Sequence, residues 1–239
     1  MLKVERRDCL CVGHAAHDIS VFVSEYPREN SKGETQLVIE CGGGPAANAV
    51  YSLSTWGKRC AFAGLVGDDS YGLRVISEFE SAATDISLLE LRSGYPTPLS
   101  VILVNEQNGS RTIVNRKISE SPYRPDASAL ARIEPKVLLF DGHELEASLD
   151  TLAAFPDAVS ILDAGSLREG TDVLSRKVGY LVASERFAMQ VSGLSDLNTD
   201  EHRREALRQL RARNDGTVVI TLGERGLIYD SGIGPRYLP

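Results

Sequence analysis

The chain lacks a long apolar run, an excess of basic residues and a secretory leader, and each absence removes a class of function. No stretch of its 239 residues approaches the roughly 20 apolar residues that a membrane-spanning helix needs. The 33 acidic side chains outnumber the 26 basic ones, and the formal net charge of −7 disfavours an extended nucleic-acid surface. Charged residues at the N-terminus are followed by no apolar segment. We therefore expect a cytoplasmic protein that binds neither nucleic acid nor membrane.

The few cysteines form no pattern that would mark a zinc site or a disulfide framework. They are Cys9, Cys11, Cys41 and Cys60, without a C-x-x-C pair and without a histidine at metal-ligand spacing. Cys9 and Cys11 share one face of an apolar segment, which favours core packing in a reducing compartment. The chain does have an ordinary globular balance, with 42% hydrophobic and 25% charged residues, which suits one large domain with or without a small appendage.

Apolar runs alternate with helical segments over most of the chain. Buried strands are predicted at residues 8–13, 59–67, 137–142, 159–165, 179–184 and 217–223, with a returning strand at 227–229. Helices are predicted to begin near residue 45 and to span residues 73–81, 144–155 and 199–213. This alternation predicts an α/β fold whose mostly parallel sheet is covered on both faces.

Two segments interrupt the alternation and read as exposed strands outside the main sheet. Residues 19–40 alternate loosely between apolar and polar side chains and carry no helical period. The run at 97–104 faces the run at 111–114 across a loop that contains Asn108-Gly109, a strong hairpin signal.

The segment Gly42-Gly43-Gly44-Pro45-Ala46-Ala47-Asn48 is the clearest candidate for a ligand site. Proline is favoured at the first helical position, and the free N–H groups of a helix start attract anions. Glycines let a ligand approach the backbone closely. No Lys-Ser/Thr follows, so this is not a Walker loop, and the G-x-G-x-x-G spacing of a dinucleotide site is missing. A plain turn at a helix start is the alternative.

Three further polar segments follow predicted strands and should lie at the same edge of the sheet. Asp18 follows the first strand and could accept hydrogen bonds from hydroxyl groups, or could be an aspartate in a turn. Asp68 and Asp69 follow the second strand and could cap the next helix. Residues 221–226 are either a phosphate-binding turn or an ordinary β-turn.

Taken together, these segments resemble the ribokinase-like (PfkB) carbohydrate kinases along essentially the whole chain. The residues that carry the resemblance are Gly13 and Asp18, the segment 43–48, the Gly-Leu-Val-Gly-Asp-Asp-Ser-Tyr-Gly element at 64–72 and the Thr-Leu-Gly-Glu-Arg-Gly element at 221–226. The resemblance implies a three-layer α/β/α sandwich with a mostly parallel central sheet and a small β-sheet lid. The core would comprise residues 1–18, 41–95 and 117–239, and the lid residues 19–40 and 96–116.

The same resemblance implies an ATP-dependent kinase that phosphorylates a hydroxyl of a sugar, a ketose-like one in particular. Its sugar ligands would be Asp18, Gly43, Gly44 and Asn48. Its contacts with ATP would be Thr221, Gly223 and Gly226. Family members often dimerise through the lid, so we expect a homodimer. A lid that closes over the reacting groups also excludes water from them.

The chain departs from the family pattern where an Asn-x-x-Glu element helps to organise Mg²⁺. Here the run is Ser184-Glu185-Arg186-Phe187, which resembles the divergent ketohexokinase-like and sulfofructose-kinase-like branch. Glu185 could still reach the metal through water. Arg111, in the hairpin, is similar to a lid residue of ketohexokinase-like members and could neutralise phosphate charge. A solvated hairpin charge is the alternative for Arg111.

The family's Asp-Thr-x-Gly-Ala-Gly-Asp element, which carries the catalytic base, is missing from the sequence. The run Asp163-Ala164-Gly165-Ser166 is superficially similar but comes too early. We therefore expect no catalytic base within the chain, a base in a segment beyond Pro239, and no activity of these 239 residues without that segment. The alternative is a catalytically inactive sugar-binding or regulatory protein with the same fold.

Overall fold

The computed structural model describes residues 4–116 and 122–239, and its largest element is a nine-stranded sheet. The strands lie in the order β13-β12-β11-β10-β9-β8-β1-β4-β5. All pairs from β11 to β5 are parallel, and only the β11–β12 and β12–β13 pairs are antiparallel. The strands are β1 (Glu5–Val12), β4 (Cys60–Gly67), β5 (Asp85–Arg92), β8 (Ile133–Phe140), β9 (Val159–Ala164), β10 (Tyr180–Ser184), β11 (Thr217–Thr221), β12 (Leu227–Asp230) and β13 (Arg236–Leu238).

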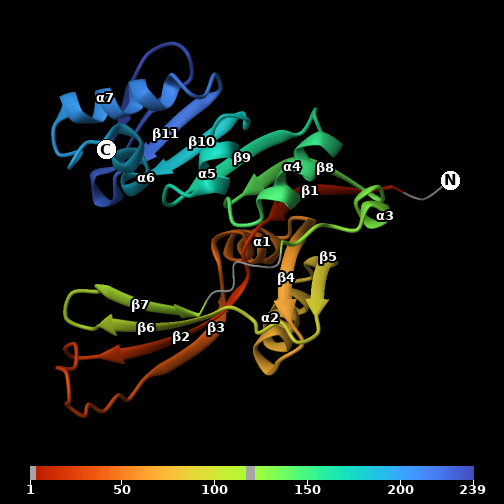
Figure 1. Ribbon diagram of the computed structural model, residues 1–239, viewed down its shortest axis with the longest axis vertical. Helices are drawn as coiled ribbons and strands as arrows, with labels where there is room; N and C mark the ends of the chain where they lie inside the picture. Colours follow the sequence, from red (N-terminus) through yellow and green to blue (C-terminus); the bar gives the residue numbers. More distant parts are fainter. Residues whose placement is uncertain (1–3, 117–121) are drawn as a thin grey trace.

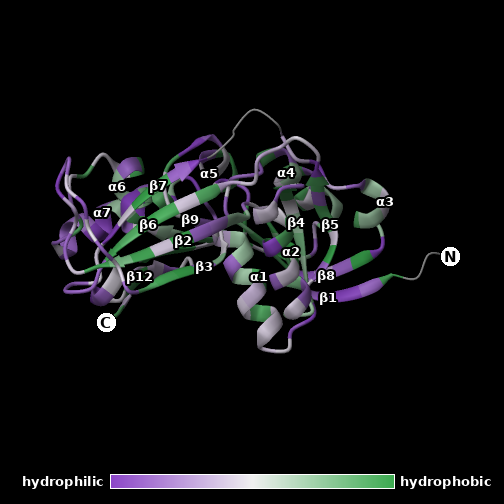
Figure 2. Ribbon diagram, turned by 90° about the horizontal axis from the view of Figure 1, so that it is seen from below, coloured by the Kyte–Doolittle hydropathy of each residue, from purple (hydrophilic) through white to green (hydrophobic). Residues whose placement is uncertain are grey.

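A separate four-stranded sheet projects away from the main sheet as a lid (Figure 1). Its order is β3-β2-β6-β7, from β2 (Ala16–Val23), β3 (Val38–Gly43), β6 (Leu99–Asn105) and β7 (Arg111–Arg116). The predicted hairpin is confirmed, because β6 and β7 pair antiparallel across a turn in which Gly109 has a φ of 69°. In Figure 2 the lid strands β2, β3 and β6 show extended hydrophobic stretches.

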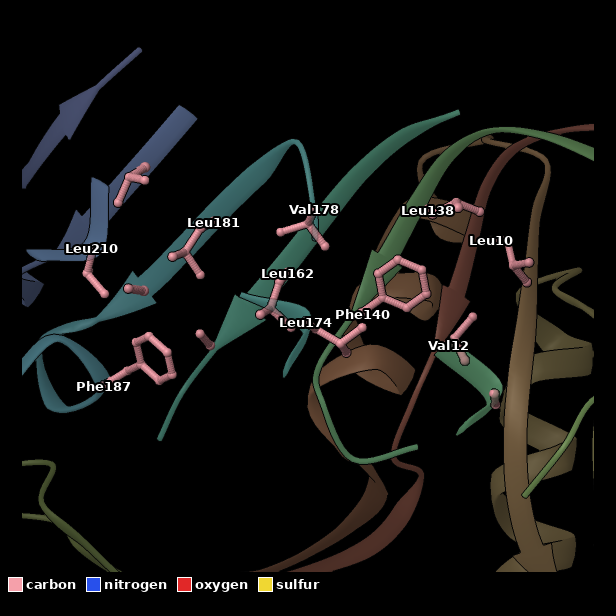
Figure 3. Close-up of a cluster of buried hydrophobic side chains, with 14 of the residues drawn as sticks. Leu10, Val12, Leu138, Phe140, Leu162, Leu174, Val178, Leu181, Phe187 and Leu210 are labelled. Atoms are coloured by element: carbon pink, nitrogen blue, oxygen red, sulfur yellow. The ribbon is translucent and has the colours of Figure 1, made fainter. Parts of the chain in front are cut away.

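Two apolar clusters, one on each face of the main sheet, form the core. Strand β1 contributes to both, because Cys9 and Cys11 face one cluster while Leu10 and Val12 face the other. Helices α1 (Pro45–Thr55) and α2 (Ser70–Ser81) cover the cysteine side. The larger cluster, drawn in part in Figure 3, packs under α4 (Leu145–Ala154), α5 (Glu169–Leu174), α6 (Glu185–Ser192) and α7 (Asp200–Arg211). The predicted sandwich of helices around a mostly parallel sheet is therefore confirmed.

Several elements differ from the sequence prediction. Strand β5 and the short helices α3 (Ala127–Leu130), α5 and α6 were not predicted. Helix α2 begins at Ser70 and not at residue 73, because Asp69 caps it by accepting the N–H of Gly72. Across the described residues, none of the helices has both the length and the apolar character that crossing a bilayer requires.

Candidate functional site

A glycine turn joins β3 to α1 at the point where the lid meets the main sheet. Gly43 ends β3, Gly44 is the N-cap residue of α1 with a φ of 101°, and Pro45 is the first helical residue. A Cβ atom on Gly43 would lie 2.2 Å from Oδ2 of Asp18. Only glycine therefore lets the Asp18 carboxylate lie directly against the backbone of this turn.

Asp18 is the carboxylate that the turn contacts. It lies on lid strand β2, opposite Cys41 of β3, and not in a loop. Its Oδ1 atom is buried and accepts no hydrogen bond from any residue that the structure describes. A buried carboxylate oxygen without a donor is costly, and the hydroxyl of a ligand would satisfy it. The structure thus brings two predicted sugar ligands, Asp18 and Gly43, into contact.

Asn48 lies one turn into α1 and faces a hollow at the edge of β3. The hollow has a volume of about 320 Å³, and its lining includes Cys41, Gly42 and Glu78 of α2. The backbone N–H of Gly42 donates to both carboxylate oxygens of Glu78, at 2.9 and 2.8 Å. Asn48 is exposed, so its amide is available to a ligand that enters the hollow next to the glycine turn.

Asp141, which the sequence analysis did not single out, fixes the same turn to the core. It follows β8 and is only 2% exposed. Its Oδ2 accepts the N–H groups of His14 at 2.9 Å and Ala46 at 3.2 Å, and its Oδ1 accepts that of His143 at 2.9 Å. Burial raises the pKa of Asp141, although these three donors partly oppose the shift. In the sequence, the one feature that could have pointed to Asp141 is an Asp-Gly pair at the carboxyl end of a buried strand.

Thr97, just before β6, ties the lid to the core. Its hydroxyl accepts the N–H of Gly67 at 2.9 Å, and its own N–H donates to Oδ2 of Asp69 at 2.9 Å. Arg116 of β7 donates to the Thr97 carbonyl at 2.8 Å. Partial burial alone would raise the pKa of Asp69, but hydrogen bonds from Thr97 and Gly72 outweigh it and lower the pKa. The predicted capping role of Asp69 is confirmed. The same carboxylate also helps to hold the lid to the core through the N–H of Thr97.

A second set of contacts holds the lid against α2. His17 is 1% exposed, and its Nε2 lies 3.1 Å from Oε2 of Glu40 on the neighbouring strand. Its ring stacks on Tyr71, with centroids 4.9 Å apart. Arg74 also contacts the Glu40 carboxylate, and the hydrogen bond from His17 together with this charge lowers the pKa of Glu40. Helix α2 therefore fixes the base of the lid beside Asp18 and the glycine turn.

The predicted nucleotide turn follows β11, at the same carboxyl edge of the sheet. Thr221 ends the strand with an exposed side chain, and Gly223 begins a single 3-10 turn. Gly223 has a φ of 63° with no atom within 4 Å of the position that a Cβ would take, and Gly226 has a φ of 76°. An exposed hydroxyl beside an open glycine backbone fits a phosphate group.

Glu185 and Arg111 are the two remaining residues that the sequence predicted for the site. Glu185 directly follows Ser184, the partner of Thr221 in the sheet. The Glu185 carboxylate pairs with Arg225 of the β11 turn at 2.5 Å. Arg111 begins β7 opposite Val104, four residues along β6 from Ser100, the partner of Asp18 in the sheet. Four strand residues span about 13 Å. The structure therefore does not bring Arg111 and Asp18 together within the chain.

A basic group that the sequence analysis also missed lies between the two turns. Arg168, just before α5, has its Nη1 atom 3.0 Å from Nδ1 of His143 and donates from Nη2 to Ser166 at 2.9 Å. The ring of His143 stacks on that of His14, with centroids 4.6 Å apart. His14, His143 and Arg168 follow the carboxyl ends of β1, β8 and β9, respectively, and these three strands are neighbours in the sheet. No local motif marks them in the sequence.

Comparisons with known proteins agree with this arrangement. The sequence pattern of the family described as pfkB family carbohydrate kinase matches residues 6–236. Mouse ketohexokinase is 34% identical over 111 residues, which are 46% of this chain and 37% of the ketohexokinase. The matched part thus covers little more than a third of that relative's own length.

Solved structures share the fold. The ribokinase of Giardia lamblia superposes with a TM-score of 0.80 at 17% identity, covering 97% of this chain and 76% of that one. The ribokinase of Arabidopsis thaliana, solved with ribose and ATP, gives a TM-score of 0.77 at 17% identity and covers 97% and 77%.

Proposed function

The chain belongs to the pfkB family of carbohydrate kinases, and on that premise we propose that the protein transfers the γ-phosphoryl group of ATP to a hydroxyl of a ketose-like sugar. The observation that carries this proposal is the unsatisfied Oδ1 of Asp18, buried against the backbone of Gly43. A sugar hydroxyl that donates to this oxygen would remove the cost of leaving it without a partner. Gly44 and Asn48 extend the same surface and would contact further hydroxyls of the sugar.

We place the nucleotide at Thr221, Gly223 and Gly226. The exposed hydroxyl of Thr221 and the open backbone of Gly223 suit phosphate oxygens, whereas Gly226 lies against the carbonyl of Leu238. ATP would supply the phosphoryl group, with Mg²⁺ held mainly by its phosphates and by water. Glu185 could approach the ion only through water, since its carboxylate faces Arg225. Within the described residues, no cluster of three or more acidic, histidine or cysteine side chains could form a metal site by itself.

The chain's own residues would act mainly by positioning. Asp141, Thr97 and the contacts of His17 hold the glycine turn and the lid in one arrangement, so the acceptor hydroxyl would be presented in a fixed orientation. The base that takes the hydroxyl proton is proposed, as in the family pattern, to lie in a segment that follows residue 239.

We also propose that a second copy of the chain covers the lid. Register and strand alternation place Val38, Val101 and Val114 on the lid face opposite to Asp18, and these side chains are 51%, 38% and 69% exposed. Contiguous exposed apolar side chains of this kind mark association surfaces. A dimer formed there would stiffen the lid.

The test is a coupled assay of ADP formation by the product of the complete reading frame, with Mg-ATP and a panel of ketohexoses, aldoses and nucleosides. We expect sugar-dependent ADP release, with ketoses among the accepted substrates. Absence of transfer to every acceptor would refute the kinase proposal. Sugar binding without transfer, measured by calorimetry, would support the inactive binding protein in its place.

A further inference from the structure

Arg168 is a half-buried guanidinium that has no carboxylate partner among the described residues. Its two terminal nitrogens contact the ring of His143 and the hydroxyl of Ser166. In the part of the chain that the structure describes, no carboxylate lies within ion-pair distance of Arg168. The buried Asp141 is taken up by three backbone donors. Burial lowers the pKa of Arg168. The carboxylates of Asp141 and Asp163 act on Arg168 only from beyond ion-pair distance. A partly desolvated guanidinium without a direct carboxylate partner favours an anionic ligand.

Arg186 brings a second guanidinium to the same place. It lies on the first turn of α6 and makes no hydrogen bond or ion pair with the described residues. Strands β9 and β10 pair up to Ala164 and Ala183, so the segments that carry the two arginines leave the sheet side by side. Ser184 donates to the carbonyl of Gly165 at 2.8 Å and joins these segments. The positive charge of Arg186 accordingly contributes to the lowered pKa of Arg168.

The two arginines lie between the proposed subsites for sugar and nucleotide. On the sugar side, Arg168 contacts His143, whose ring stacks on His14, and the His14 carbonyl lies against Gly44. On the nucleotide side, Glu185 precedes Arg186 and pairs with Arg225 of the β11 turn. A cationic pair in a chain of net charge −7 is therefore placed where donor and acceptor would meet.

We propose that Arg168 and Arg186 form an oxyanion subsite that binds one phosphate-like group in the cleft. Two guanidinium groups suit a tetrahedral oxyanion, because each has five N–H donors and the contacts of Arg168 with His143 and Ser166 use only some of them. The group has two possible sources, the transferring γ-phosphoryl of ATP or an anionic substituent on the sugar. This inference rests on the proposed function for its place in the reaction, but the binding of a free oxyanion does not depend on turnover.

The first experiment is a calorimetric titration of the protein with inorganic phosphate at low ionic strength. Arg168→Gln and Arg186→Gln should each weaken binding by at least about tenfold, whereas Arg168→Lys should lose less because it keeps the charge. Arg176→Gln is the matched control, an exposed arginine paired with Asp172, and should bind as the wild type does. Equal affinity of the wild type and Arg186→Gln, which removes no contact of the fold, would overturn the proposal.

The second experiment identifies the source of the oxyanion with the same variants and the kinase assay. If the γ-phosphoryl is bound, Arg186→Gln should lower kcat with every acceptor alike. If the sugar carries the anion, the wild type should prefer a phosphorylated sugar over its neutral parent, and Arg186→Gln should lose that preference. If the protein shows no turnover but binds phosphate in a way that depends on both arginines, the subsite is supported and only the kinase proposal is refuted. Turnover and phosphate binding that are both unaffected would refute the subsite alone.

Discussion

Replacement of Asp141 by asparagine tests whether one buried carboxylate fixes the glycine turn to the core. The wild-type carboxylate accepts three backbone N–H groups, two on Oδ2 and one on Oδ1. Asparagine has one carbonyl oxygen, so if it keeps His14 and Ala46, its NH₂ group meets the N–H of His143. Leaving that partly buried donor unsatisfied should cost about 1–3 kcal/mol of unfolding free energy. For a chain of this size, the melting temperature should fall by roughly 2–12 °C.

The assay is urea unfolding of the wild type, Asp141→Asn and the control Asp150→Asn. Asp150 lies on α4 and forms a surface ion pair with Arg124, so its substitution should cost at most about 1 kcal/mol. An Asp141→Asn protein as stable as Asp150→Asn would refute the anchoring role.

The pH dependence of the difference in unfolding free energy between the wild type and Asp141→Asn gives an independent check. Burial raises the pKa of Asp141 above its usual value of 3.8, so the native state holds this proton more tightly than the unfolded state. Its contribution to stability is therefore complete below about pH 4 and declines as the pH rises through the raised pKa. The stability advantage of the wild type over Asp141→Asn should shrink over that interval. An advantage that grows as the pH rises from 4 would contradict the direction of the shift.

Three further predictions concern the site and the lid. Gly43→Ala puts a Cβ atom 2.2 Å from Oδ2 of Asp18 and should weaken sugar binding by at least about tenfold in calorimetry, whereas Gly33→Ala, with no atom within 4 Å, should not change it. Thr97→Val leaves the N–H of Gly67 without its acceptor and should lower the unfolding free energy in urea by about 1–3 kcal/mol. A loss below about 0.5 kcal/mol, as expected for an exposed substitution, would contradict the role of Thr97 in holding the lid to the core. Val114→Asp on the exposed lid face should shift a dimer to monomer in sedimentation velocity, and a wild type that is monomeric at micromolar concentration would refute association through the lid.

The alternation of strands and helices could be predicted because it depends on local periodicity. Pro45 marks the start of α1, and the apolar runs mark β4 and β8–β11 within a few residues. Strand β5 was missed because its sequence mixes charged and apolar residues directly after a helix. The lid strand β2 begins at Ala16, before the predicted boundary at residue 19, since pairing with β3 extends as far as Gly43.

The site could be predicted only where one segment carries its own signal. The run of glycines before Pro45 indicates a close approach of something to the backbone, and the structure identifies that neighbour as Asp18. Asp141 and Arg168 carry no such signal, because their roles depend on backbone groups and rings from segments far away in the chain. An Asp-Gly pair after a strand reads locally as a turn. That Asp141 is buried and accepts three backbone N–H groups depends on tertiary structure.

The most direct test of the central claim is the steady-state kinetics of Asp18→Asn with the sugar that the wild type accepts best. The isosteric change keeps the packing against Gly43 and removes the charge that should bind the sugar hydroxyl. We predict a fall in kcat/KM of at least about 100-fold, which corresponds to roughly 3 kcal/mol of lost interaction with a charged acceptor. The control Asp157→Asn, at an exposed position before β9, should keep the wild-type value. Wild-type kcat/KM in Asp18→Asn would contradict the assignment of Asp18 and the glycine turn as the sugar site.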